Sequence, residues 1–185
     1  MARTIPTTTY HVPGDLVTAE TWNTGPKALN DFLTNRPVFQ GQCHSASTVA
    51  SNSWTAVPFD FSLIDTDGGN NVAFNNTRYT IQVAGQYWVV GMVAWNTAGS
   101  GLVRADSAVA KNGSIYVGSS QFLSIQLASP SSMTCSALVQ GAVGDYIEMW
   151  GRQLSGANQL FDTGTLTNGS TRTGYGMMNL FWVRS

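Results

Sequence analysis

The pair of residues best suited to nucleophilic chemistry is Cys43 and His44, a thiol and an imidazole that are neighbours in the chain. Adjacent side chains in a strand point to opposite faces of the sheet, so this imidazole would not readily take the thiol's proton. A serine nucleophile is not indicated either, because the sequence contains no G-x-S-x-G motif. We therefore expect a buried thiol beside a surface imidazole, with no catalytic residues and no enzymatic activity. Cys135 could form one bridge with Cys43, but two cysteines without a repeated spacing are more often separate buried thiols.

The carboxylates do not indicate a chemical site. Glycoside cleavage needs two acids that face each other across a substrate, whereas the acids of this chain are dispersed and no pair stands out. They include Asp60, Asp65, Asp67, Asp106, Asp145, Glu148 and Asp162. The segment 65–70 alternates acids before a glycine, as a calcium loop does, but it lacks the bidentate glutamate that closes such a loop. We expect a polar turn there and no metal or cofactor, with bound calcium as the alternative.

Exposed aromatic side chains could bind a sugar by stacking on one face of its ring. Four of the tryptophans fall in predicted strands and are expected in the core or in a subunit interface. These are Trp88, Trp95, Trp150 and Trp182. Trp54 lies instead in an irregular, serine-rich stretch. We therefore name Trp54 as the candidate contact for a bacterial surface carbohydrate.

The composition favours self-association over binding to nucleic acid or membranes. Charged residues make up only 10% of the chain, well below the roughly 25% typical of soluble domains. Such a chain can bury large surfaces against copies of itself without stranding ions, whose burial unpaired is costly. The net charge is −1 and the arginines are scattered, which excludes a nucleic-acid partner. No apolar run approaches the roughly 20 residues that span a bilayer, and the N-terminus lacks the apolar centre of a secretory signal.

Two parts of the chain differ in character. Residues 1–36 predict an N-terminal arm with one short helix. Thr18 can cap a short turn that begins at Ala19, and Thr24-Gly25-Pro26 offers a second start with proline in the tolerated first turn. Leu29, Phe32 and Leu33 fall at helical spacing and form one apolar edge of this helix. Residues 37–185 predict a single all-β head, because short strand-like runs alternate there with turn clusters. The predicted strands are 38–42, 55–61, 78–83, 86–95, 107–111, 114–117, 122–127, 133–139, 145–153 and 175–183.

Two predicted strands are apolar on both faces. In 86–95, one face carries Tyr87 and Val89 and the other carries Trp88 and Met92, so neither face is suited to water. The final strand, 175–183, shows the same property, and an uncovered apolar strand invites aggregation. We expect a neighbouring subunit to supply the missing cover.

Several motifs of the head resemble a known family. The Ala84-Gly85-Gln86-Tyr87 corner, the Asn112-Gly113 hairpin, the Gly144-Asp145-Tyr146-Ile147 turn and the closing aromatic strand occur in the order found in a trimeric jelly-roll family. This family includes tumour necrosis factor and the globular heads of the first complement component. The resemblance implies a homotrimeric jelly roll with its last strand near the threefold axis. We place Tyr87, Trp150, Phe181 and Trp182 at the trimer interface.

The arm carries a second resemblance. The segment 13–23, with Val17-Thr18-Ala19 and Trp22-Asn23, followed by a short helix and a β head, is similar to the openings of tailed-bacteriophage structural proteins. It implies a virion protein, of the minor-tail, head-fibre or decoration type, made in the cytoplasm of the host bacterium. Trp22, Leu29, Phe32 and Leu33 would anchor each subunit to other virion proteins. The alternative is a receptor-binding, lectin-like head that recognises a host cell-surface glycan, and a signalling ligand of the same fold is disfavoured because no secretion signal is present.

Overall fold

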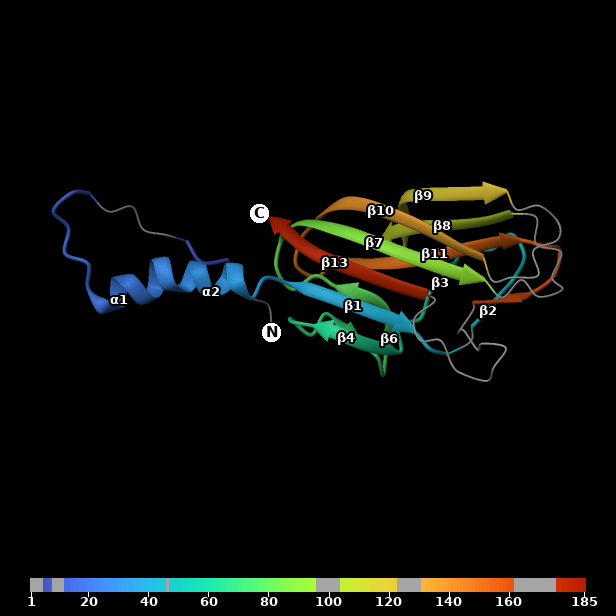
Figure 1. Ribbon diagram of the computed structural model, residues 1–185, viewed down its shortest axis with the longest axis horizontal. Coiled ribbons are helices and arrows are strands. Elements are labelled where there is room, and N and C mark those ends of the chain that lie inside the picture. The colour runs from blue at the N-terminus through green and yellow to red at the C-terminus, as the bar shows by residue number, and fades with distance from the viewer. Residues whose placement is uncertain (1–4, 8–11, 46, 96–103, 123–130, 162–175) are drawn as a thin grey trace.

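The molecule is a sandwich of two antiparallel sheets with a helical arm that extends beyond one end (Figure 1). The computed structural model describes residues 5–7, 12–45, 47–95, 104–122, 131–161 and 176–185. The C-terminal end of the last strand, β13, lies at the same end of the sandwich as the arm (Figure 1). The fold is the predicted all-β jelly roll, since the chain passes repeatedly from one sheet to the other.

The strands form three sheets. In the five-stranded sheet the order is β10 (Ser131–Gly141), β7 (Gly85–Trp95), β13 (Gly176–Arg184), β1 (Val38–Cys43) and β4 (Phe61–Asp65). In the six-stranded sheet the order is β5 (Asn70–Asn71), β6 (Asn75–Thr80), β11 (Tyr146–Leu154), β8 (Arg104–Lys111) and β9 (Ser114–Phe122), with β3 (Thr55–Ala56) also paired to β11. A small third sheet pairs β12 (Gln159–Leu160) with β2 (Thr48–Val49).

The core lies between the two large sheets, because each strand turns alternate side chains inward. Its largest fully buried side chains are Phe39, Phe59, Tyr79, Ile81, Tyr87, Trp95, Ile147, Met149, Gln153, Phe161, Met178 and Leu180. Aromatic rings meet edge to face in this layer, as Phe39 and Phe59 do with ring centres 6.1 Å apart.

Two of the predicted turns have the backbone geometry that their residues suggested. Asn112 and Gly113 both have positive φ, 52° and 75°, as a tight hairpin between β8 and β9 requires. Gly85 begins β7 with φ 148°, and a Cβ atom there would lie 2.4 Å from the carbonyl oxygen of Arg184. This corner therefore needs glycine both for its backbone angle and for its close approach to β13.

The arm contains the predicted helix, in three pieces. They are α1 (Ala19–Trp22), a π-helical turn (Asn23–Lys27) and α2 (Ala28–Thr34). Thr18 caps α1, since its hydroxyl accepts a hydrogen bond from the backbone N–H of Thr21 at 3.1 Å. The wide turn coincides with Pro26, which lacks the N–H needed to continue a regular α-helix. Within the described residues, no helix has the length and apolarity to cross a membrane.

Three predicted segments differ from the structure. The single strand predicted over 55–61 is two strands in different sheets, β3 and β4, because Pro58 interrupts the ladder and the chain changes layers there. The loop expected around 67–71 includes the short strand β5. The strand predicted over 122–127 overlaps β9 at Phe122, and its remainder lies outside the described residues.

Candidate functional site

The outward face of β7 is apolar and is not covered by the part of the chain that the structure describes. The inward residues Tyr87 and Val89 are fully buried in the core. On the opposite face Trp88 is 45% exposed, and Val90 and Met92 are half-buried. The alternation predicted for this strand is therefore confirmed, and its second apolar face lies at the surface.

Strand register extends this face across the five-stranded sheet. The first row, nearest the arm, consists of Leu138, Trp88, Phe181 and Val38. The middle row consists of Ser136, Val90, Asn179, Gln40 and Ile64. The third row consists of Thr134, Met92, Met177, Gln42 and Phe61. We call these three rows the sheet face.

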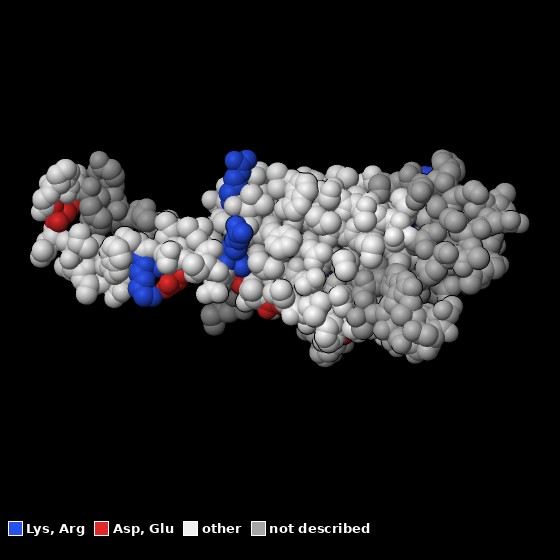
Figure 2. Space-filling view, viewed as in Figure 1, with Lys and Arg blue, Asp and Glu red and all other residues white. Residues whose placement is uncertain are grey.

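The sheet face carries no charged side chain in its three rows, all of which lie in the described residues. Figure 2 shows the surface over β1, β13 and β7 in the colour of uncharged residues, with basic atoms gathered near the junction with the arm. Its polar members are neutral hydroxyl and amide groups such as Ser136 and Asn179. An exposed apolar area of this extent is typical of an interaction surface.

The structure places the four predicted interface residues in three different environments. Tyr87 lies in the core, where its hydroxyl donates to the carbonyl of Val83, so it is not on the surface. Trp182 is also buried and donates from its indole N–H to the carbonyl of Ala84 at 3.2 Å. Trp150 is half-buried on the six-stranded sheet. Phe181 alone belongs to the sheet face, where it is exposed.

The missed members of the sheet face were visible in the sequence as the second face of β7. Trp88 and Met92 follow from alternation within one strand. Leu138 and Phe61 could not be assigned to the same surface, because only the register of β10 and β4 brings them beside β7 and β13. Pairing between distant strands is the information that the sequence lacks.

The arm residues that were predicted to anchor the protein divide into two groups. Phe32 is buried and packs edge to face against Trp182 of β13, with ring centres 5.1 Å apart. Phe32 therefore joins the arm to the head and is not free to contact an outside partner. Trp22 and Leu33 are more than half exposed, and Leu29 is half-buried.

Cys43, the last residue of β1, and His44, which follows it, lie in different environments. Cys43 is fully buried, and burial, with the negative charge of Asp60, raises the pKa of its thiol to about 12. The ring of His44 stacks on Phe61, 4.7 Å between ring centres, at the edge of the sheet face. Cys43 and Cys135 are separate buried thiols and form no disulfide.

The carboxylate of Asp65 is engaged by its own loop. It accepts hydrogen bonds from the backbone N–H groups of Gly69 and Asn70, at 3.0 and 2.9 Å. This is the geometry of the expected polar turn, in which a side chain satisfies backbone donors. Asp60 is used similarly, since it accepts from the backbone N–H of His44 at 2.6 Å and from the hydroxyl of Ser45.

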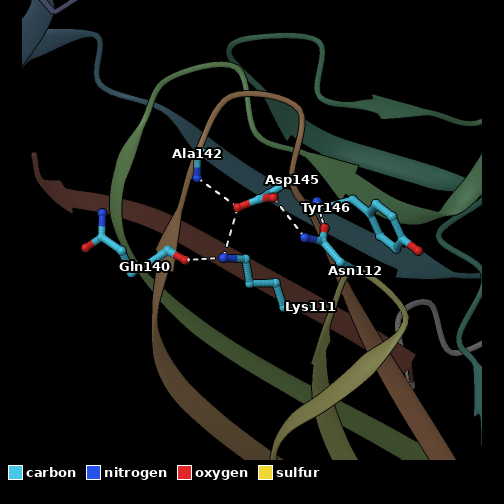
Figure 3. Close-up of polar contacts among 6 residues, drawn as sticks. All are labelled: Lys111, Asn112, Gln140, Ala142, Asp145 and Tyr146. Atoms are coloured by element: carbon cyan, nitrogen blue, oxygen red, sulfur yellow. Dashed lines mark hydrogen bonds and ion pairs between the residues drawn. The ribbon is translucent and has the colours of Figure 1, made fainter.

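A third carboxylate, Asp145, ties together two turns at the arm end of the head (Figure 3). It accepts from the side-chain amide of Asn112 at 2.8 Å and from the backbone N–H of Ala142 at 2.9 Å. Lys111 pairs with it at 2.9 Å and also donates to the carbonyl of Gln140. The pKa of Asp145 is held well below its usual range by these contacts. The largest cause is the hydrogen bond from Asn112, followed by the bond from Ala142 and the contact with Lys111.

Trp54, the candidate glycan contact, precedes β3 and is half-buried on the outer side of the six-stranded sheet. The guanidinium carbon of Arg152 lies 4.8 Å from the centre of its ring. Trp54 thus belongs to a polar and aromatic surface on the opposite side of the sandwich from the sheet face.

Comparison with solved structures identifies the fold. The globular domain of zebrafish complement 1qA superposes with a TM-score of 0.56 and 15% identity, over 81% of this chain and 100% of that domain. Murine APRIL gives a TM-score of 0.55 with 10% identity, over 80% of this chain and 98% of APRIL. The Eiger TNF of S. frugiperda gives 0.53 with 12% identity, over 81% of this chain and 95% of that protein.

No protein-family model and no curated protein sequence matches the chain. At these identities the structural likeness shows the fold alone, which is the jelly roll of tumour necrosis factor and complement heads. The architecture inferred from the Ala84-Gly85 corner, the Asn112-Gly113 hairpin and the Gly144-Asp145 turn is therefore confirmed.

Proposed function

We propose that this protein is a homotrimeric structural component of a bacteriophage particle, in which the arm attaches each copy to the virion and the β head points outward. A minor tail, head-fibre or decoration protein fits this description. The observation that carries the proposal is the exposed, uncharged and largely apolar sheet face, which the described residues leave uncovered.

Association with further copies of the chain is the simplest way to remove the sheet face from water. Trp88, Leu138 and Phe181 are 45%, 44% and 39% exposed in adjacent positions of one row. Burying them against another copy removes apolar surface from water without desolvating an ion. Neutral groups such as Asn179 and Gln40 in the middle row can form hydrogen bonds across the contact.

A second exposed apolar surface favours a ring over a twofold dimer. Ile115, Tyr116 and Val117 are consecutive, exposed and located on β9, the last strand of the six-stranded sheet. A twofold dimer through the sheet face would leave this edge in water. A ring in which the edge of one copy packs on the sheet face of the next covers both surfaces in every subunit. Three copies is the number that the family resemblance implies.

The arm supports attachment to a larger particle. It lies beyond the head (Figure 1), so it can reach a surface that the head does not touch. Phe32 fixes its base to the head through Trp182, while Trp22 and Leu33 remain exposed for a partner. The sequence resemblance to the openings of tailed-bacteriophage structural proteins is what points to a virion as that partner.

Light scattering coupled to size exclusion tests the trimer. At micromolar concentration the expected mass is three times the 19.8 kDa of the chain. A single-chain species that persists as concentration rises would refute the assembly and, with it, the proposed role.

Removal of the arm tests attachment. A variant lacking residues 1–35 is expected to remain a trimer, because the sheet face is intact, but to be missing from purified virions. A matched variant, Trp22→Ala with Leu33→Ala, keeps the whole arm and removes only its exposed apolar side chains. Incorporation of both variants at the wild-type level would show that the arm is not the attachment.

A further inference from the structure

The outer side of the six-stranded sheet carries a cluster of charged residues in a chain that has few of them. The chain has only nine basic and ten acidic residues. Five of them lie side by side on this surface, in β6, β8 and β11, and are Arg78, Arg104, Asp106, Glu148 and Arg152. All five have polar or aromatic partners, so the surface is an ordered network.

The centre of this network is Asp106, which is only 1% exposed. Its carboxylate accepts from the Nε of Arg104 at 2.8 Å and from the Nε of Arg152 at 2.7 Å. The Nη2 of Arg152 adds a contact at 2.6 Å. A guanidinium carries five N–H donors in one plane, and Arg152 uses those of two nitrogens on Asp106. Asp106 therefore fixes the plane of the Arg152 guanidinium. The side chain of Arg152 stays 23% exposed to solvent.

Aromatic rings flank the charged pair. Trp54 lies against the guanidinium of Arg152, and Trp150 is held by a hydrogen bond from its indole N–H to Glu148 at 3.0 Å. Both indoles are half-buried. Farther along β11, the guanidinium of Arg78 lies 4.3 Å from the centre of the ring of Tyr146.

Two fully buried alanines of β8 lie beside Trp150 and Glu148. Ala108 pairs with Trp150 and Ala110 pairs with Glu148 across the outer side of the sheet, and both alanines are fully buried. An alanine on an outward face is buried only when a larger neighbour covers it. Trp150 is the largest side chain of that row, so we infer that its indole lies over Ala108 and turns one face to solvent.

We propose that this surface, formed by Trp54, Arg104, Trp150 and Arg152 and held in place by the buried Asp106, binds a saccharide. Sugar rings present an apolar C–H face that packs on an indole, while their hydroxyl groups pair with planar, fixed guanidinium groups. A simple phosphate fits less well, because Asp106 already neutralises one of the two arginines. The surface lies on the opposite side of the sandwich from the sheet face, so it stays accessible when that face is buried. This inference goes beyond the proposed structural role.

Ligand-observed saturation-transfer NMR tests the proposal with the full chain. The probes are glucose, galactose, rhamnose, N-acetylglucosamine and glucuronic acid, as monosaccharides and short oligomers, together with purified bacterial cell-wall polysaccharide. We expect at least one probe to receive saturation, and its affinity to be measured by calorimetry. Trp54→Ala and Arg104→Gln should each weaken binding by about tenfold or more, since each removes one ordered contact.

Leu16→Ala is the control, because Leu16 is 84% exposed but lies in the arm and has no assigned contact. It should bind like the wild type. Trp150→Phe keeps an aromatic ring at this position, so it is less disruptive to the fold than an alanine variant. It should bind the saccharide more weakly than the wild type, because phenylalanine cannot donate the hydrogen bond to Glu148. Failure of every probe to bind, or equal binding by the wild type and Trp54→Ala, would overturn the saccharide site. The trimer is judged separately, by light scattering on the same samples.

Discussion

Replacing Trp88 by alanine is the sharpest test of the sheet face. Trp88 is 45% exposed, and because an aromatic side chain of this class buries about 150 to 250 Å² in full, roughly 70 to 110 Å² remains to be covered by a second copy. At about 25 cal/mol per Å², that area contributes about 2 to 3 kcal/mol for each subunit that joins. The corresponding weakening of association is about 30- to 150-fold per subunit.

The assay is sedimentation velocity over a concentration series that spans nanomolar to tens of micromolar. The Trp88→Ala variant should dissociate at concentrations where the wild type is still assembled. Its single-chain fold should also lose some stability, because more than half of the indole is already covered within the isolated subunit. Thermal unfolding by circular dichroism under dissociating conditions measures that loss separately from the loss of association.

Val72→Ala is the control, since Val72 is 50% exposed but lies in the turn between β5 and β6, away from the sheet face. It should assemble like the wild type. If Trp88→Ala dissociates at the same concentration as Val72→Ala and the wild type, the sheet face is not the contact between subunits, whatever the oligomeric state.

Three further predictions concern the head itself. Asp145→Asn should lower the free energy of unfolding by about 1.5 to 3 kcal/mol, the range for hydrogen bonds to charged groups. Because folding lowers the pKa of Asp145, its stabilisation is present above the unfolded-state pKa of about 3.9 and is lost as pH falls through the folded-state value. Urea titrations from pH 7 to 2 should therefore show the wild type converging on the variant in acid, and a constant gap would contradict this. Gly85→Ala should destabilise by about 1 to 3 kcal/mol or more, since its Cβ would lie 2.4 Å from the Arg184 carbonyl oxygen; an unchanged melting temperature would contradict the close approach of this corner to β13. The Cys43 thiol, buried and with a pKa raised to about 12, should react with a thiol reagent at pH 8 only after denaturation, and rapid labelling of the folded protein at Cys43 would show that it is accessible.

Local sequence patterns were sufficient for the elements whose determinants lie close together in the chain. Asn112-Gly113 predicted a hairpin because few other residue pairs adopt positive φ at both positions. Thr18 and the apolar spacing of Leu29 and Phe32 predicted the helix. The strand over 55–61 failed because its composition does not report the change of sheet at Pro58, which depends on β4 and β11 elsewhere in the chain.

The candidate surfaces, too, were predicted only as far as local sequence patterns reach. Alternation alone revealed that β7 has two apolar faces. It did not place Tyr87, which was predicted at the interface and lies in the core, because nothing local distinguishes an inward apolar face from an outward one. Trp150 and Phe181 looked equivalent in sequence and lie on different sheets. Only the packing of one sheet on the other assigns a face to the core.

The sequence by itself determined the all-β class, the arm with its helix, the tight turns and the excess of apolar surface, since these depend on propensities and periodicities of neighbouring residues. The tertiary structure decided which strands are adjacent, and therefore that Leu138, Trp88, Phe181 and Val38 form one row and that Asp106 lies between two arginines. Those groupings join residues up to 143 positions apart, as Val38 and Phe181 are, and strand pairing over such separations is fixed by the packing of the whole chain, not by any local segment.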